Sequence, residues 1–527
     1  MSATPTPAAA AAAGSRSADE LTLTFTLDGR AVEVADDGAT LLEVLRDRIG
    51  DRSPKDGCSP QGQCGCCTVL VDGAPRVACV TPVRRVAGRS VVTAAGLPDD
   101  ERTAWAEAFC ATGASQCGFC TPGILVRLAA LKRKGGTDVD GALLAHLCRC
   151  TGWRTIHEAY AAFGREHPPR NLDAASRRAS IEGGVTQRVG PDVALGGGGF
   201  ADDSAPLDAL VAVPDGRGGW AVGETLADAR LVAGKVQGRR TTVAVRQPLE
   251  VPSGDWDVTL RTTWVEPAYL EPDASWCEPG GEPATPLANG GAFGGKAASV
   301  APEVARRLAG EHGRAVRVLL SREDVVRLGP KRPPVAAGAR RDGTGTVRVA
   351  RTPGIADLLA AHAPGLVVEE VDVTGPPTST APRAAGWAEA AVLLTGARGE
   401  RAPVRSPVGA VAEAAVTADG IHVRVDCGQP LDEVVLRSYC IGAAHMALGW
   451  VTAEAVAVDD DGTPHDLTIR SFGILRARDM PAVDVEIVRS DRPPVNGSDA
   501  VFVAVAAAAW IDQGCPQDWP TDRGRTM

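Results

Sequence analysis

The 527-residue sequence lacks the marks of several large protein classes. No apolar run reaches the roughly 18 residues that a membrane-spanning helix needs. Basic residues are not in excess, because the formal net charge is -10, and this argues against a nucleic-acid-binding surface. We find no repeat period. The hydrophobic content of 44% suffices for sizeable cores, and the length allows three or four domains of ~100–200 residues each.

The start of the chain lacks the basic residues that open a secretory leader. An alanine run at 8–13 resembles the short apolar part of such a leader, but alanine is only weakly apolar. We therefore expect residues 1–19 to form a disordered tail. We also expect a cytoplasmic protein, because the thiolate groups described next suit a reducing compartment.

Cysteine is the residue type with the most informative pattern. Of the 14 cysteines, eight within the first 150 residues form two sets of four. The first set is Cys58, Cys64, Cys67 and Cys79, and the second set is Cys117, Cys120, Cys148 and Cys150. Each [2Fe–2S] cluster needs four thiolates, so the two sets predict two iron–sulfur clusters and electron transfer. A disulfide framework fits small secreted chains instead, and a zinc site would not explain two adjacent sets.

The first set lies in a glycine-rich loop between predicted strands. We expect strands at 21–26, 31–34 and 68–71, with a helix capped by Thr40 among them. The spacing C-x5-C-x2-C is one residue longer than in plant-type ferredoxins. The loop glycines allow backbone N–H groups to point at the cluster sulfurs, which raises the reduction potential. Cys66 is a fifth thiol here, and we interpret it as a small buried hydrophobic residue.

The second set combines a C-x2-C pair with a C-x-C pair. The first pair lies at a predicted helix start, where Thr121 and Pro122 favour initiation and free N–H groups face an anionic cluster. A second helix is expected around residues 143–147, ending at the C-x-C pair. Residues 98–165 are therefore expected to be helical, with two helix ends facing one cluster.

Beyond this region the sequence changes character twice. Residues 166–205 are rich in Arg, Gly and Asp and predict a linker. Residues 206–527 mix β-branched segments with Ala-rich ones, which predicts an α/β region. No G-x-G-x-x-G loop follows a predicted strand, so the usual dinucleotide fingerprint is not found.

The cysteine motifs resemble those of the iron–sulfur subunit of the xanthine oxidase/dehydrogenase and carbon monoxide dehydrogenase family of molybdenum hydroxylases. The matching segments are 63–70, 116–123 and 148–152. The resemblance implies a multidomain α+β protein. Its expected domains are a β-grasp ferredoxin domain at 20–97, a helical [2Fe–2S] domain at 98–165, and, after the linker at 166–205, a shortened mixed α/β molybdopterin-binding-like region at 206–527.

Four further motifs, in order, resemble the molybdopterin-binding subunit of that family. They are segments 269–272, 290–296, 383–389 and 425–428. Glycines in the second segment would permit close approach to a pterin cofactor. The resemblance implies that the cofactor contacts Gln116, Gly290, Gly291, Phe293, Gly294, Gly295 and Lys296. It also implies that Arg383 stabilises a developing anion, the alternative being a structural or solvated arginine.

Several departures from the family pattern matter for function. A stretch before Gly290 that contains a substrate-side glutamine is missing, and Ala297 stands where purine-oxidising members have glutamate. The terminal Gly-x-Gly-Glu that supplies the general base is not visible. Asp499 lies near that position and is the candidate base, the alternative being a helix N-cap. No flavin (FAD) domain lies between the two parts.

The resemblance implies an oxidoreductase that hydroxylates or dehydrogenates an aldehyde or N-heterocycle. Electrons would leave a molybdopterin site through the second cysteine set and then the first. The acceptor would be an electron-acceptor protein or a separate flavin subunit, and an oligomer is possible. The alternative is an electron-transfer subunit whose cofactor region is degenerate and which serves a partner.

Overall fold

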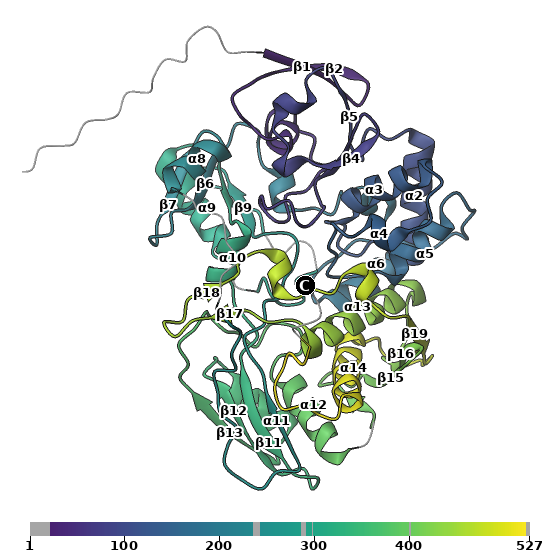
Figure 1. The fold of residues 1–527 in the computed structure, drawn as a ribbon, viewed down its shortest axis with the longest axis vertical. Helices are drawn as coiled ribbons and strands as arrows, with labels where there is room; N and C mark the ends of the chain where they lie inside the picture. Colours follow the sequence, from purple (N-terminus) through teal and green to yellow (C-terminus); the bar gives the residue numbers. More distant parts are fainter. Residues whose placement is uncertain (1–21, 235–242, 286–290, 298, 400–401, 523–527) are drawn as a thin grey trace, which may run out of the picture.

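The computed structural model of the protein describes residues 22–234, 243–285, 291–297, 299–399 and 402–522. The tail expected at 1–19 and the loop residue Gly290 lie outside these residues. In Figure 1 the N-terminal region, residues 22–165, occupies the upper part of the molecule, and much of the C-terminal region, residues 206–522, lies below it. The predicted multidomain α+β fold is confirmed.

Residues 22–92 form a five-stranded sheet in the order β2-β1-β5-β3-β4, in which β1 and β5 are parallel. Asp28 and Gly29 have φ of 50° and 81°, as a tight hairpin turn requires. Thr40 caps the first helix by accepting a hydrogen bond from the Glu43 N–H at 3.2 Å, and Gly50 ends the continuing π-helix. The elements are β1 (Thr22–Leu27), β2 (Arg30–Ala35), α1 (Leu41–Glu43), η1 (Val44–Ile49), β3 (Thr68–Val71), β4 (Ala74–Val77), η2 (Ala78–Val80), η3 (Val83–Val86) and β5 (Ser90–Val92).

The helical domain contains α2 (Asp99–Thr112), α3 (Thr121–Arg133), α4 (Val139–Ala142) and α5 (Arg154–Ala162). The helix start at Thr121 is confirmed. The helix expected around residues 143–147 is wrong, because α4 ends at Ala142 and the C-x-C pair lies in a loop before α5. Leu143 and Leu147 are nevertheless buried, so their apolar character reflects burial and not helical periodicity. Helix α3 thus begins directly after Cys120, whereas Cys148 and Cys150 lie outside the described helices.

Residues 166–205 connect the two regions but contain helices of their own. Asn171 caps α6 (Leu172–Gly183), which packs against the long helix α13 (Glu433–Thr452). Arg178 and Glu182 of α6 form an ion pair of 2.9 Å that is fully buried. Two further short helices follow, α7 (Pro191–Ala194) and η4 (Ala201–Ser204). The segment expected to be a linker therefore contributes buried side chains to the C-terminal region.

The C-terminal region contains three four-stranded sheets, each covered by helices. The first has the order β7-β6-β10-β9 and packs against α8 and α9. Its elements are β6 (Leu210–Pro214), β7 (Trp220–Gly223), α8 (Leu226–Ala233), β9 (Ala274–Cys277), α9 (Ala301–His312) and β10 (Val316–Leu319). The second has the order β13-β12-β11-β8. Its elements are β8 (Val258–Arg261), β11 (Val335–Ala339), β12 (Gly345–Ala350), α11 (Ile355–His362), β13 (Leu366–Val371) and α12 (Trp387–Arg398).

The third sheet has the order β14-β15-β16-β19 and packs against two apolar helices, α13 and α14. Its elements are β14 (Val404–Arg405), β15 (Val411–Thr417), β16 (Gly420–Asp426), β19 (Val483–Ile487) and α14 (Ser498–Asp512). The remaining elements are α10 (Arg322–Leu328), β17 (Ala457–Val458), β18 (Pro464–His465), η5 (Ile469–Phe472) and η6 (Ala477–Asp479).

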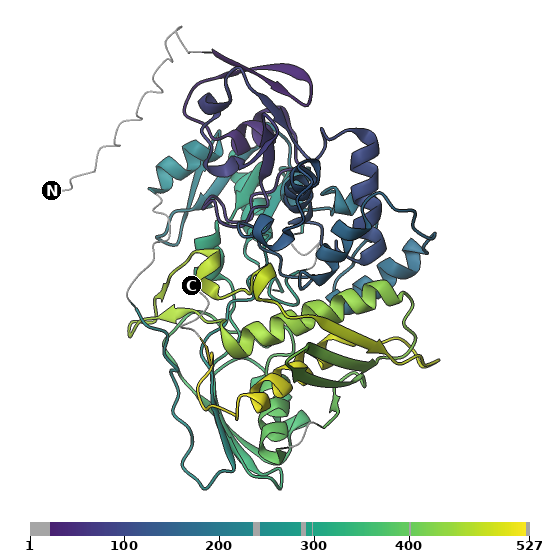
Figure 2. The same ribbon diagram turned by 45° about the vertical axis from the view of Figure 1, so that its right-hand side comes forward.

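Helix α13 crosses the middle of the molecule beneath the helices of the N-terminal region (Figure 2). Within the described residues it is the one helix long and apolar enough to cross a membrane. However, 83% of its most apolar window is buried inside the protein. Its apolar surface is therefore accounted for by core packing, as in the central helix of a globular domain.

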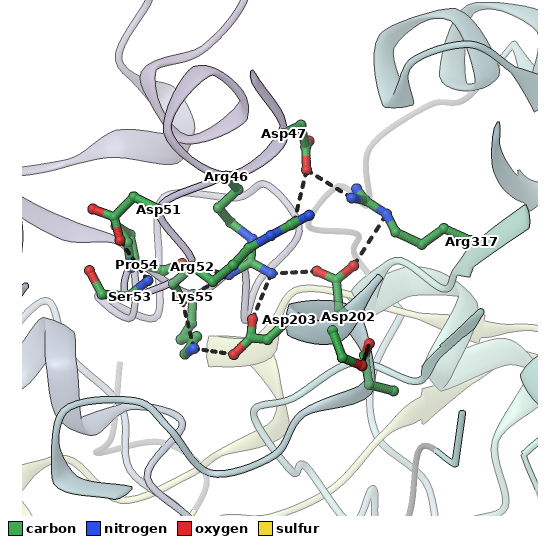
Figure 3. A network of polar contacts seen from close by, with 12 residues as sticks. Arg46, Asp47, Asp51, Arg52, Ser53, Pro54, Lys55, Asp202, Asp203 and Arg317 are labelled. Atoms are coloured by element: carbon green, nitrogen blue, oxygen red, sulfur yellow. Dashed lines mark hydrogen bonds and ion pairs between the residues drawn. The ribbon is translucent and has the colours of Figure 1, made fainter. Parts of the chain in front are cut away.

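A network of ion pairs joins the N-terminal region to the first sheet of the C-terminal region (Figure 3). Arg46 Nη2 lies 2.6 Å from Asp202 Oδ2 and 2.9 Å from Asp203 Oδ1, and Lys55 also pairs with Asp203. Arg317 completes the network through an oxygen of Asp202 at 3.2 Å. Burial opposes ionisation of Asp202, but the guanidinium groups of Arg317 and Arg46 outweigh it and hold its pKa below the usual value.

We expect Arg46→Ala to lower the free energy of the first unfolding transition by about 2 kcal/mol, because it removes a buried guanidinium that binds two half-buried carboxylates, which Arg317 and Lys55 still contact. Arg48→Ala is the matched control, because Arg48 pairs with Asp37 nearer the surface and its loss should remove less than ~1 kcal/mol. Urea unfolding of the purified protein, followed by tryptophan fluorescence, measures both. Equal losses in the two variants would contradict the importance of this network.

Candidate functional site

The first cysteine set is gathered in the loop between η1 and β3, together with η2. Its four side chains are each at most 2% exposed. The N–H of Gln61 donates to the Cys58 sulfur at 3.2 Å, and the N–H of Cys79 donates to the Cys67 sulfur at 3.5 Å. Hydrogen bonds from the thiols of Cys64 and Cys79 lower the pKa of Cys58 well below its usual value. The loop therefore favours a thiolate at this position.

The second set is brought together from the start of α3 and the loop before α5. The sulfurs of Cys117 and Cys150 lie 3.5 Å apart. The thiol of Cys120 lowers the pKa of Cys148 to about 6 against the opposing effect of burial, and Thr151 Oγ1 lies 3.1 Å from the Cys148 sulfur. Among the described residues, no group of three or more His, Cys, Asp or Glu side chains is placed to hold a metal ion.

The two cysteine loops are in direct contact. The N–H of Leu147, next to the second set, donates to the carbonyl of Cys64 in the first set at 3.0 Å. A β-carbon at Gly123 would lie only 2.2 Å from the carbonyl oxygen of Gly65, so this residue must be small. Cys66 is also fully buried. A hydrogen bond with the Cys64 thiol lowers the pKa of the Cys66 thiol, but burial raises it, and the pKa lies above its usual value. The two cysteine sets are therefore held in loops that touch each other.

The glycine-rich loop at 291–296 lies against the second set. A β-carbon at Gly291 would lie 2.9 Å from the Cys150 sulfur and 3.3 Å from the Cys117 sulfur. Gln116 is buried beside it and donates to the carbonyl of Cys150 at 3.1 Å and to the hydroxyl of Ser438 at 2.9 Å. Its Oε1 atom has no hydrogen-bond partner among the described residues. This buried acceptor is available to a group bound in the adjoining space.

The first two motifs of the C-terminal region are joined by a buried ion pair. Lys296 Nζ lies 2.6 Å from Glu271 Oε2, and both side chains are at most 7% exposed. Burial raises the pKa of Glu271 to about 7, although Lys296 acts in the opposite direction. The segment 269–272 therefore anchors the end of the glycine-rich loop.

The two candidate catalytic residues also contact each other. Arg383 Nε lies 2.8 Å from Asp499 Oδ1, and Arg383 also bonds the hydroxyl of Ser498. Its guanidinium carbon lies 4.2 Å from the centre of the Phe293 ring. Asp499 occupies the first turn of α14, whose N-cap is Gly497, so the N-cap alternative does not describe it. The sequence alone did not predict this contact, because the two residues are 116 positions apart.

A cavity of about 400 Å³ opens at this point. Its volume is within the range of small-molecule sites. It is lined by Glu182, Gly183, Gly184, Val185, Ala292, Phe293, Gly294, Lys296, Ala297, Ala381, Arg383, Ala384, Asn496 and Asp499. Four of the predicted site residues, Phe293, Gly294, Lys296 and Arg383, thus line the same cavity as the candidate base.

Glu182 is a residue of this site that the sequence did not reveal. Its carboxylate accepts hydrogen bonds from the N–H groups of Gly497 and Ser498 at the start of α14, the latter at 2.8 Å. Glu182 follows Arg178 by four positions, which is the spacing of neighbours on one face of a helix. This spacing could have indicated the ion pair between the two residues. The composition of the segment, however, predicted a linker.

Arg149 is a second such residue, and it lies between the two C-x-C cysteines. It donates from Nε to the carbonyl of Pro267 at 3.0 Å and from Nη2 to Glu454 Oε2 at 2.8 Å, with a further bond to Glu454 Oε1. Both side chains of the pair are 3% exposed. A bidentate ion pair thus binds the C-x-C loop to the C-terminal region.

These residues fit the groups that the motifs predict. The eight buried thiols supply two four-sulfur sets. A cofactor in the cavity would meet Phe293 and Lys296 of the glycine-rich loop, and the buried Gln116 Oε1 is an acceptor without a partner among the described residues. Gly294 and Gly295 must be small, because β-carbons there would clash with Ala381 and Pro267. Their small size lets the loop pack against these two residues.

Three sequence models of protein families match the chain. Residues 25–84 match a 2Fe-2S iron-sulfur cluster binding domain, and residues 93–161 match a [2Fe-2S] binding domain. Residues 411–481 match a molybdopterin cofactor-binding domain. The two iron–sulfur matches each contain one complete cysteine set, and the third contains segment 425–428. The chain thus has two [2Fe–2S] domains and a molybdopterin cofactor-binding domain, and none of the three matches is a flavin domain.

Relatives of known sequence resemble the N-terminal region. The nicotinate dehydrogenase small FeS subunit of Eubacterium barkeri is 35% identical over 147 residues, which are 27% of this chain and 93% of that protein. The nicotine 6-hydroxylase small subunit of Paenarthrobacter nicotinovorans is 38% identical over 147 residues, covering 27% of this chain and 88% of that protein. The xanthine dehydrogenase of Drosophila subobscura is 37% identical over 168 residues, covering 27% of this chain and 12% of that protein.

A solved structure resembles almost the whole chain in fold. The aldehyde oxidoreductase from Desulfovibrio gigas has a TM-score of 0.69 at 15% identity, covering 93% of this chain and 97% of that chain. At this identity the likeness concerns the fold alone. Together with the sequence relatives and the domain matches, it shows that the chain belongs to the xanthine dehydrogenase family of molybdenum hydroxylases.

Proposed function

We propose that the protein is an oxidoreductase that passes electrons from a molybdopterin-type site through two [2Fe–2S] clusters to an external acceptor. The observation that carries the proposal is the position of Gly291. Gly291 lies against the Cys150 and Cys117 sulfurs, and its neighbour in the chain, Ala292, lines the cavity, so one loop contacts both the second cysteine set and the cavity. Electron transfer between neighbouring centres needs such proximity.

In this proposal the two cysteine sets are the cluster ligands. Cys117, Cys120, Cys148 and Cys150 hold the cluster next to the cavity, and Cys58, Cys64, Cys67 and Cys79 hold the outer one. The hydrogen bond from Leu147 to Cys64 supports this order, because it links the two loops directly. The expected domains at 20–97 and 98–165 are the two cluster-binding units, the connecting segment is 166–205, and the cofactor region is 206–527.

The cofactor would be held by Gln116, Gly290, Gly291, Phe293, Gly294, Gly295 and Lys296. When bound, it supplies oxygen transfer and accepts the electrons of the substrate. The chain's own contribution is electrostatic, since Arg383 places a fixed positive charge at the cavity where a developing anion would be stabilised. Asp499 holds that guanidinium in place at 2.8 Å and is the nearest candidate for a proton acceptor.

The proposed substrate is a small aldehyde or N-heterocycle other than a purine. Ala297 lines the cavity where a purine-oxidising site would need a polar partner. The acceptor is an electron-acceptor protein or a separate flavin subunit, which is in keeping with relatives that are themselves named as subunits. A reducing compartment such as the cytoplasm suits the thiolate ligands.

A second candidate function is an electron-transfer subunit with a degenerate cofactor region. The Arg383–Asp499 ion pair favours it, because the carboxylate of the candidate base is engaged in a contact within the protein. The molybdenum content of protein expressed with ample cofactor distinguishes the two. Molybdenum at about one atom per chain supports the first proposal, and its absence in protein with intact clusters supports the second.

We expect purified protein to contain about four irons per chain and to show two paramagnetic signals after reduction. Cys58→Ser should remove one signal and Cys148→Ser the other, since each is proposed to ligate a different cluster. Cys515→Ser, outside both sets, serves as the control and should leave both signals intact. Iron for a single cluster in fully matured protein would contradict this assignment.

We expect the protein to oxidise xanthine poorly while its clusters still accept electrons from dithionite. A missing general base typically lowers a rate by ~10²–10⁴-fold, and the terminal Gly-x-Gly-Glu that supplies this base in the family is not visible in this sequence. Xanthine turnover and cluster bleaching are measured on the same sample. Rapid turnover that is abolished by Arg383→Ala, but not by the exposed control Arg405→Ala, would restore an efficient purine hydroxylase.

A further inference from the structure

Arg322, at the start of α10, is a fully buried arginine with an incomplete set of partners. Its side chain is 0% exposed, and Nη2 donates to the carbonyl oxygens of Gly57 and Leu270, each at 2.9 Å. Nε and Nη1 have no hydrogen-bond partner among the described residues, and the guanidinium forms no ion pair with any of them. A buried charge without a counter-charge is strongly unfavourable. The guanidinium therefore needs a negative group that the polypeptide does not supply.

Carboxylates of the neighbouring segments already have partners of their own. Glu266 pairs with Lys331 at 2.9 Å, and Glu271 pairs with Lys296 at 2.6 Å.

Asp273 accepts a hydrogen bond from the hydroxyl of Tyr269 at 2.9 Å. Asp324 is held by the N–H and hydroxyl of Ser321 in a helix cap. Glu323 accepts a hydrogen bond from Gln61 Nε2 at 2.8 Å, and Asp56 accepts one from the Ser59 N–H at 3.0 Å. The Tyr269 ring lies 5.8 Å from the guanidinium carbon and offers it the negative face of an aromatic ring.

The position of Arg322 points to the first cysteine set. Gly57, whose carbonyl it binds, directly precedes Cys58. A β-carbon at Gly57 would lie 3.1 Å from the Cys64 sulfur and 3.1 Å from the Leu270 carbonyl oxygen, the other acceptor of Arg322. The guanidinium and the Cys64 sulfur thus both lie close to Gly57 in this loop. A cluster held by four thiolates carries the negative charge that the site lacks.

We propose that Arg322 is the counter-charge of the first [2Fe–2S] cluster and raises its reduction potential. The inference rests on the proposed function, since it requires that Cys58, Cys64, Cys67 and Cys79 hold a cluster. Reduction transfers one electron from the donor to the cluster, turns a dianion into a trianion, and makes or breaks no bond. A fixed cation nearby stabilises the trianion more than the dianion. Arg322 is therefore a positioning and tuning residue contributed by the C-terminal region.

One consequence concerns the direction of electron flow. Because α10 belongs to the C-terminal region, the first cluster reaches its working potential only when that region is docked on the loop at 57–67. A higher potential at the outer cluster draws electrons away from the cavity and toward the acceptor. Electron exit is thereby coupled to correct assembly of the two regions.

The test is a redox titration of the full chain, followed by the paramagnetic signals of the two clusters. Arg322→Gln should shift the first-cluster equilibrium at least tenfold toward the oxidised form, which is about 59 mV for one electron. The second cluster serves as an internal reference and should not move. Arg322→Lys, which keeps the charge, should stay within threefold of the wild type. Arg327→Gln is the matched control, because Arg327 is exposed on the same helix.

Each outcome decides the proposal. An unchanged first-cluster potential in a fully metallated Arg322→Gln protein overturns it, as does an equal fall in Arg322→Lys. Arg322→Met is a second neutral variant in case the glutamine variant does not assemble. If both neutral variants lose the first cluster while Arg322→Lys retains it, the charge is required to hold the cluster and the proposal stands. Loss of the cluster in all three variants overturns it in favour of a purely structural role, whereas two clusters missing from the wild type refute the proposed function itself.

Discussion

The ion pair between Arg149 and Glu454 is the contact on which the rest of the site depends. Arg149 lies between two cysteines of the second set, and Glu454 follows the long helix α13 of the C-terminal region. The pair is 3% exposed on both sides, so removing either partner would leave a buried charge, at a cost of about 3–5 kcal/mol. It thereby fixes the second cysteine set against the cavity loop.

The cavity has charged residues but little net charge. Arg383 is paired with Asp499, Lys296 with Glu271, and Glu182 with a buried arginine of α6. Each of these charges has a partner of opposite charge, and Glu182 also accepts hydrogen bonds from the N–H groups at the start of α14. Preorganised charges of this kind favour transition states in which charge develops at a defined point.

Charged contacts recur wherever the N-terminal and C-terminal regions meet. Arg46 and Lys55 reach Asp202 and Asp203 at one end of the contact, and Arg322 reaches the first cysteine loop nearer its centre. Buried polar contacts specify one arrangement, because a shifted interface would leave unpaired charges. Electron transfer between fixed centres benefits from such an arrangement, since its rate depends on their separation. In the proposed function, the contact between the two regions would therefore serve electron transfer as well as stability.

The sequence by itself determined the features that depend on neighbouring residues in the chain. The hairpin at Asp28 and Gly29, the Thr40 cap, the helix start at Thr121 and the two cysteine sets follow from local turn chemistry, capping and ligand spacing. Local patterns failed at residues 143–147, where apolar side chains are buried by tertiary contacts without forming a helix.

Only the tertiary structure decided which distant residues meet. The contacts of Arg383 with Asp499, of Arg149 with Glu454 and of Arg322 with Gly57 span 116, 305 and 265 positions of the chain. No local preference encodes these pairs, because an ion pair forms only after the packing of helices and sheets has brought both charges to the same buried place. For the same reason the sequence did not identify Glu182 as a site residue, because it lies in a segment whose composition predicted a linker. Its role exists only where the start of α14 presents N–H groups to it.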